Sequence, residues 1–100
     1  MPFAIQIMPS ALAELKVTKA FYQRQIIKAI DDQLLHQPLL ATKNRKMLLG
    51  PSATFEYTPP LWELRVGDFR VFYDVDEAEQ VVFVRAVREK PPHAQTEEVS

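Results

Sequence analysis

The sequence contains no cysteine and only two histidines among its 100 residues. The absence of cysteine excludes a disulfide framework and a thiolate metal site, and it agrees with a location in the reducing cytoplasm. The two histidines, His36 and His93, have no cluster of aspartate or glutamate at metal-ligand spacing around them. We therefore expect neither a metal ion nor another cofactor.

Long hydrophobic runs are also missing. No stretch of 18 apolar residues occurs, and the amino terminus lacks the basic head and apolar centre of a signal peptide. The sequence therefore predicts no membrane partner. With 47% hydrophobic and 25% charged residues, the chain has the composition of one globular domain that covers residues 1–100.

A large positive charge is the third absence. The formal net charge is −1, whereas nucleic-acid-binding domains are usually clearly basic. The average hides a local difference, because acidic residues gather at residues 74–79 and again at Glu97 and Glu98. A basic surface elsewhere on the chain is therefore compatible with the composition.

Hydrophobic periodicity predicts one strand and two helices in the first half of the chain. Residues 3–8 alternate as a strand does, and Ser10 is expected to cap a short helix that follows. Thr18 is expected to cap a second, longer helix, which Pro38 ends. The apolar stripe of that helix consists of Tyr22, Ile26, Ile30 and Leu34.

The second half of the chain is predicted to be a meander of three strands. The strands cover residues 61–66, 69–75 and 80–87, and residues 37–60 before them form a long loop or include a short edge strand. After the last strand, residues 91–100 are expected to form a flexible tail. The order β-α-α-β-β-β predicts an α+β fold, in which two helices pack on one face of a small, twisted, mostly antiparallel sheet.

A two-residue turn at Gly67 and Asp68, of type II′, fixes the register of the first hairpin. One face then carries the apolar pairs Val66–Phe69, Leu64–Val71 and Trp62–Tyr73, and we expect it to lie against the helices. On the other face Glu63 opposes Phe72, and Arg65 opposes Arg70.

A second turn over residues 76–79 would place Arg85 opposite Arg70 and Phe83 opposite Phe72. Three arginines would then form a row across three strands, beside a solvent-exposed aromatic pair. Facing like charges destabilise a sheet, so we expect either an anion or water between them. Guanidinium groups beside aromatic rings are typical of surfaces that hold phosphates and stack bases. The alternative is that Arg70 pairs diagonally with a carboxylate and that the arginines are only solvated.

The hairpin "LWELRVGDFRVFYDV" and the following "VVFVRAVREK" resemble the RelE/ParE superfamily of bacterial toxins from toxin–antitoxin systems. The likeness is strongest over residues 61–90 and extends more loosely to residues 3–36 and the basic segment "TKNRK". It implies a β-α-α-β-β-β fold and a cognate antitoxin protein as partner. RelE-type members cut mRNA on the ribosome, whereas ParE-type members poison DNA gyrase.

For the RelE type, the resemblance implies a catalytic set on the exposed sheet face. Arg70 matches the third-strand arginine of the family, Lys90 lies near the basic residue after the last strand, and His93 lies near a family tyrosine. His93 or Glu63 could act as acid or base while arginines stabilise the developing charge. His93 could equally be a solvated tail residue. The expected set is Arg65, Arg70, Arg85, Lys90, His93 and Glu63.

Further residues are expected to contact RNA around this set. Those of the basic segment could instead form an ordinary solvated loop. The expected RNA-binding residues are Lys43, Arg45, Lys46, Phe72, Phe83 and Arg88.

The sequence therefore favours a RelE-like, metal-independent endoribonuclease that inhibits translation and arrests growth. A ParE-like inhibitor of DNA gyrase and a non-catalytic member that only binds antitoxin are the two alternatives. In all three cases we expect an antitoxin to cover the arginine-bearing face or the apolar groove beside it.

Overall fold

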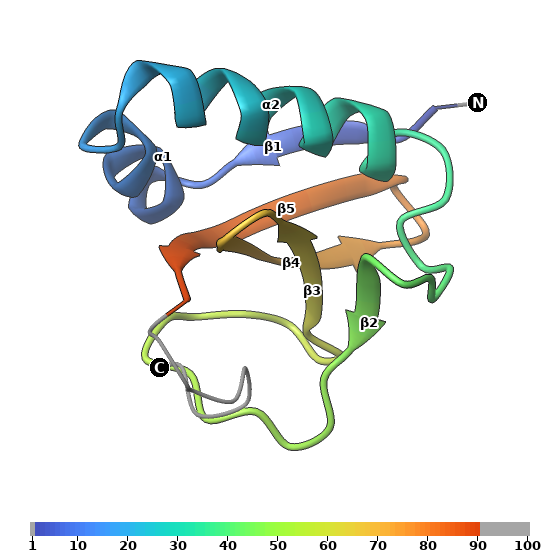
Figure 1. Cartoon of the computed structure of the whole chain (residues 1–100). Helices are drawn as coiled ribbons and strands as arrows, with labels where there is room; N and C mark the ends of the chain where they lie inside the picture. Colours follow the sequence, from blue (N-terminus) through green and yellow to red (C-terminus); the bar gives the residue numbers. More distant parts are fainter. Residues whose placement is uncertain (1, 91–100) are drawn as a thin grey trace.

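The structure, a computed structural model, describes residues 2–90. Its elements are β1 (Ala4–Ile7), α1 (Pro9–Lys16), α2 (Ala20–Leu34), β2 (Arg45–Met47), β3 (Trp62–Val66), β4 (Phe69–Asp76) and β5 (Val81–Glu89). The strands form one sheet in the order β1-β5-β4-β3-β2, with β1 parallel to β5 and the other pairs antiparallel. Both helices lie on one face of this sheet (Figure 1). The predicted α+β fold is confirmed, and β2 is the short edge strand that the sequence allowed.

The two predicted helix caps are wrong. α1 begins at Pro9, which suits a first helical position because it needs no amide partner. The Ser10 hydroxyl instead donates to the carbonyl oxygen of Arg85 in β5 at 2.8 Å. The Thr18 hydroxyl donates backwards to the carbonyl oxygen of Glu14 at 3.0 Å, at the end of α1, and does not cap α2.

No helix among residues 2–90 is long and apolar enough to cross a membrane.

The core lies between α2 and the helix-facing side of the sheet. Ile26, Ile30 and Leu34 of α2 are buried there, as the stripe predicted. Tyr22, the first residue of the stripe, lies at its margin and is partly exposed. The sheet contributes Trp62, Leu64, Val66, Phe69, Val71, Tyr73, Val82, Val84 and Val87. The predicted buried face of the first hairpin is therefore confirmed.

Tyr73 is a buried polar group in this core. Its hydroxyl donates to the carbonyl oxygen of Pro38 at 2.6 Å, and burial raises the pKa of Tyr73 well above its usual range. We expect Tyr73→Phe to lower the free energy of unfolding by about 1–3 kcal/mol, because the buried carbonyl loses its donor. Urea denaturation measures this loss.

The pH dependence of the same variant provides a check. The raised pKa means that Tyr73 contributes stability that is fully present below about pH 10, its usual pKa. That contribution is lost as the pH rises further, because only the unfolded chain ionises readily. Tyr73→Phe should therefore lose less stability above that pH than the parent protein does. An unchanged free energy of unfolding at neutral pH would show that the hydrogen bond contributes nothing.

The register of the first hairpin is confirmed in every predicted pair, including Arg65 opposite Arg70. Gly67 has a φ of +57°, whereas Asp68 is not among the residues with positive φ. This is the pattern that a type II′ turn requires, and glycine adopts it without strain.

The register of the second hairpin differs from the prediction. The ladder between β4 and β5 continues to Asp76 opposite Val81, so the turn lies at residues 77–80, one residue later than expected. The partner of Val81 thereby moves by two residues along β4. A bulge then adds one residue to β5, and this residue is Arg85. As a result Arg88, and not Arg85, lies opposite Arg70.

Candidate functional site

The sheet face turned away from the helices is partly covered by the segment of residues 48–61, which we call the covering segment (Figure 1). Phe72 is 2% exposed and packs with Leu48, Leu61 and Ala86. The ring of Phe55 lies 5.7 Å from that of Phe72. The prediction of an exposed Phe72–Phe83 pair is therefore wrong, because the protein's own chain covers Phe72.

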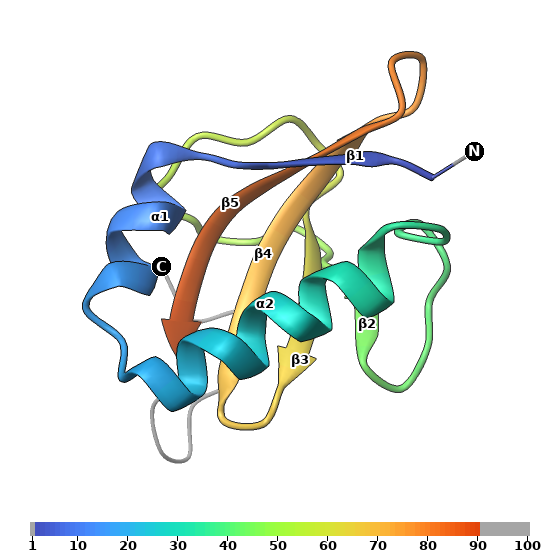
Figure 2. The same cartoon turned by 90° about the horizontal axis from the view of Figure 1, so that it is seen from above.

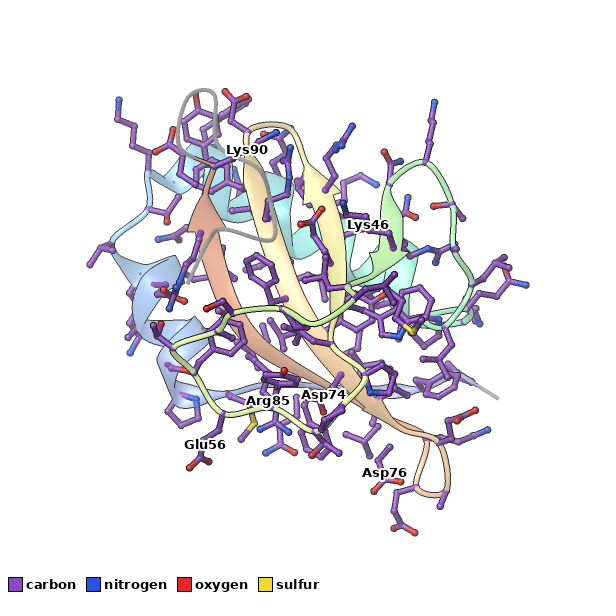
Figure 3. All side chains as sticks on the ribbon, turned by 90° about the horizontal axis from the view of Figure 1, so that it is seen from below. Lys46, Glu56, Asp74, Asp76, Arg85 and Lys90 are labelled. Atoms are coloured by element: carbon purple, nitrogen blue, oxygen red, sulfur yellow. The ribbon has the colours of Figure 1, made fainter. Side chains whose placement is uncertain are left out.

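Arg85 lies beneath the covering segment and is held by Asp74, a buried residue of β4 (Figure 3). Its Nε and Nη2 donate to the two carboxylate oxygens at 2.6 and 3.1 Å. Asp74 also accepts the backbone N–H of Thr58 at 3.1 Å, and the Arg85 guanidinium lies over the Phe83 ring at 5.0 Å. Asp74 and Arg85 therefore join β4, β5 and the covering segment, and Asp74 balances the charge of Arg85.

Arg65, Arg70 and Arg88 occupy facing positions on three adjacent strands, and we call them the arginine row. Arg70, 5% exposed, lies in its centre. Its Nη1 donates to the carbonyl oxygens of Gly67 and Phe69, both at 2.8 Å. The hairpin's own backbone therefore fixes the Arg70 guanidinium in place.

The charge of Arg70 is incompletely compensated. The Nε of Arg70 lies 3.8 Å from Oε1 of the buried Glu63. This Nε has no hydrogen-bond partner among residues 2–90. Burial lowers the pKa of the Arg70 guanidinium, whereas the charge of Glu63 raises it. The charge of Arg65 lowers the pKa further, and that of Asp68 raises it. An added anion would relieve this arrangement.

Arg88 is fixed from two sides. Its Nε donates to Oε2 of Glu14 at 3.0 Å, while the other oxygen of Glu14 accepts the N–H of Val87 at 2.9 Å. On the opposite side the guanidinium lies over the Phe55 ring at 5.2 Å and contacts the Thr54 hydroxyl at 3.4 Å. Arg88 therefore bridges α1 and the covering segment. No sequence pattern indicates the role of Glu14, which is 74 residues away from Arg88.

Two lysines flank the hairpin at the same end of the sheet. Figure 3 shows Lys90 after β5 on one side and Lys46 in β2 on the other, with the acidic turn at Asp76 at the opposite end. The backbone N–H of Lys90 donates to the carbonyl oxygen of Asp68 in the hairpin turn at 2.7 Å. The positive charge therefore gathers at the hairpin end.

The basic segment before the sheet is divided by the fold. Lys43 and Lys46 are exposed, whereas Arg45 is 7% exposed. The Nη1 of Arg45 donates to the carbonyl oxygen of Gln33 in the last turn of α2, where a cation is favoured by the helix dipole. The structure thus places Arg45 at a helix end and leaves the two lysines on the surface.

The remaining predicted residues are placed as follows. Glu63 lies on the same face of β3 as Arg65 and opposes Phe72, and Phe83 is partly buried beside Arg85. His93 lies outside the described residues. Within residues 2–90, no group of three or more histidine, aspartate or glutamate side chains could hold a metal ion.

Comparison with known structures shows the same fold. A chain of the RelBE2 toxin–antitoxin complex from Mycobacterium tuberculosis is 16% identical, with a TM-score of 0.70 over 90% of this chain and 100% of that one. A chain of the archaeal RelE–RelB complex from Pyrococcus horikoshii is 21% identical, with a TM-score of 0.70 over 94% and 100%. A mutant of the Escherichia coli toxin RelE in the free state is 19% identical, with a TM-score of 0.56 over 94% and 88%.

Comparison with curated protein sequences gives no significant match. A family model, however, matches residues 5–90, nearly the whole described chain, and its description is the ParE toxin of the type II toxin–antitoxin system parDE. The predicted membership of the RelE/ParE superfamily is thereby confirmed. The chain belongs to the ParE toxin family and is the toxin of a type II toxin–antitoxin module.

Proposed function

We propose that this toxin is a RelE-like endoribonuclease that cleaves mRNA on the ribosome in the cytoplasm and that a cognate antitoxin protein neutralises it. The arginine row is the observation that carries the proposal. It places three cations on adjacent strands, and the central one is the buried guanidinium of Arg70, which the hairpin backbone holds. The structural relatives support an antitoxin partner, because two of them are complexes of this kind.

The charges of the row suit a phosphate backbone. Three carboxylates, Glu63, Asp68 and Glu14, lie near the three arginines. Lys90 and Lys46 add two further positive charges at the same end of the sheet. Guanidinium groups bind phosphate oxygens with charge-assisted hydrogen bonds. A bound phosphate would therefore also remove the repulsion between Arg65 and Arg70.

Cleavage by a ribose 2′-hydroxyl requires stabilisation of the charge that develops on the phosphate. Arg70 is suited to this role, because backbone carbonyls hold it and no reorganisation is needed. Glu63 is our candidate base and Lys90 our candidate acid. Lys90 is placed for this role, because it follows β5 and its backbone N–H donates to the carbonyl oxygen of Asp68 in the hairpin turn.

A ParE-like action on DNA gyrase is the second candidate. The burial of Glu63 beside Arg70 favours it, because a buried carboxylate is poorly placed to take a proton from a bound ribose. The description of the matching family model also favours it.

One expression experiment separates the two candidates. The toxin is induced in a bacterial host, the 5′ ends of the messages are mapped, and plasmid supercoiling is measured in the same culture. We expect growth arrest with cleaved translated messages and normal supercoiling, and we expect the adjacent antitoxin gene to restore growth. Growth arrest with intact messages would contradict the endoribonuclease proposal. A loss of plasmid supercoiling would indicate that DNA gyrase is the target.

Arg65→Gln tests the arginine row without disturbing the fold. Arg65 is exposed, and its charge disfavours the charged form of Arg70. The variant should therefore keep or raise the melting temperature, yet cleave a ribosome-bound message about tenfold more slowly, because a charge-assisted phosphate contact is lost. Primer extension measures the cleavage. Arg24→Gln, an exposed arginine of α2, is the matched control, and equal rates for both variants would contradict the site.

A further inference from the structure

A groove of about 610 Å³ opens between the turn that joins α1 to α2 and the end of β5. Figure 2 shows this turn beside the end of β5. Lys19 and Tyr22 line the groove together with Phe69, Val87 and Arg88. Its volume lies in the range of about 300–1,000 Å³ that is usual for ligand sites.

Aromatic rings lead from the surface into this groove. The Phe21 ring, 64% exposed, contacts the Tyr22 ring edge-on at 5.3 Å, and the Tyr22 ring lies 5.3 Å from that of Phe69. Val17, beside them at the groove's rim, is 87% exposed. Exposed aromatic and aliphatic groups of this size are typical of a surface that a ligand covers.

The charge around the groove is positive on the helical side. Residues 15–23, which include the turn between the helices, contain Lys16 and Lys19 and no acidic residue. Lys28 pairs with Asp32 at 2.6 Å, whereas Lys19 faces the groove. Glu14 and Glu89 also line the groove, but Glu14 is engaged with Arg88 and the N–H of Val87. Lys19 and Arg88 are thus the cations available to an incoming anion.

The groove is continuous with the arginine row, because Arg88 belongs to both. Of the five N–H donors of a guanidinium, Arg88 uses one towards Glu14 and one towards Thr54. The others can contact a phosphate. A strand of RNA that crosses the row would therefore reach the groove at its next nucleotides.

We propose that the groove binds one unstacked nucleobase of single-stranded RNA, with the base against Tyr22 and Phe69 and its phosphate between Lys19 and Arg88. The inference rests on the proposed function, since it extends the RNA site of that function. Stacking on an aromatic side chain is tolerant of sequence, so the groove would hold the strand without selecting a base.

The test is binding of a fluorescein-labelled single-stranded RNA to the full chain, followed by anisotropy. Tyr22→Leu should raise the Kd about tenfold, because stacking is lost, whereas Tyr22→Phe should keep the parent Kd. Lys19→Gln should weaken binding and reduce the slope of log K against log salt by about one. Lys28→Gln, an exposed lysine outside the groove, should bind as the parent does.

A second RNA, abasic at one central position, separates base from backbone. It should bind the parent chain more weakly than intact RNA does, and the difference should shrink in Tyr22→Leu. Melting temperatures show whether each variant is folded. If Tyr22→Leu and Lys19→Gln are folded and bind RNA as the parent does, the proposal is overturned. The proposal is also overturned if the two variants lose antitoxin binding but keep RNA binding, because the groove would then be a binding site for a peptide.

The groove proposal and the cleavage proposal can fail independently of each other. If Arg65→Gln weakens RNA binding and the groove variants do not, only the groove proposal fails. If the groove variants weaken RNA binding while messages stay intact in arrested cells, the cleavage proposal fails and the groove remains an RNA site.

Discussion

Phe72→Ala should lower the free energy of unfolding by about 3–5 kcal/mol, the usual cost of removing a buried phenylalanine. Phe72 is the largest side chain of the small core beneath the covering segment, where it contacts Leu48, Leu61 and Ala86. Its loss leaves a cavity and removes the surface on which Phe55 packs. The covering segment should therefore be released before the rest of the protein unfolds.

Two measurements check this expectation. Urea denaturation gives the free energy of unfolding, and limited proteolysis with mass spectrometry locates the first cleavage, which we expect within residues 48–61. Leu49→Ala is the matched control, because Leu49 belongs to the same segment but is exposed. Unchanged protease resistance in Phe72→Ala would mean that other contacts hold the segment.

Asp74→Ala is expected to cost about 3 kcal/mol of unfolding free energy, because it leaves the partly buried Arg85 without its counter-charge. The change also removes the acceptor for the Thr58 N–H. The double variant Asp74→Ala/Arg85→Met should recover part of the loss, since no unpaired cation then remains beneath the covering segment. Chemical denaturation of the two single variants and the double variant gives the coupling.

The same set of variants assigns the role of Arg85. Because Asp74 holds Arg85, we expect the folded Arg85→Met variant to cleave RNA at nearly the parent rate, in contrast to Arg65→Gln. A loss of cleavage in a folded Arg85→Met protein would return Arg85 to the catalytic set. Additive effects of the two single variants on stability would show that the ion pair itself contributes nothing.

The first hairpin shows what a sequence pattern can predict. A two-residue turn allows one register, and the alternation of apolar residues then decides which face is buried, so Arg65 opposite Arg70 followed directly. The second hairpin shows the limit. A bulge adds one residue to a strand and leaves composition and alternation almost unchanged, so the sequence pattern does not indicate it. As a result Arg88 lies opposite Arg70, where Arg85 was expected.

Long-range contacts account for the other differences. The irregular composition of residues 48–61 predicts a loop, but nothing in it indicates that Phe55 packs on Phe72. The short basic segment likewise gave no sign that Arg45 turns inward to the end of α2. In each case the partner lies elsewhere in the chain, and only the assembled sheet brings the two together.

The way in which α1 lies along β5 has a consequence for association between molecules. β1 accompanies β5 only as far as Val84, and an uncovered strand beyond that point would present unpaired backbone groups to other chains. The Met8 N–H donates to the carbonyl oxygen of Val84, and the Ser10 hydroxyl donates to that of Arg85. The Glu14 carboxylate accepts the N–H of Val87. Met8 and two residues of α1 therefore occupy backbone groups of β5 beyond the end of β1, which lowers the tendency of this edge to pair with a strand of another molecule.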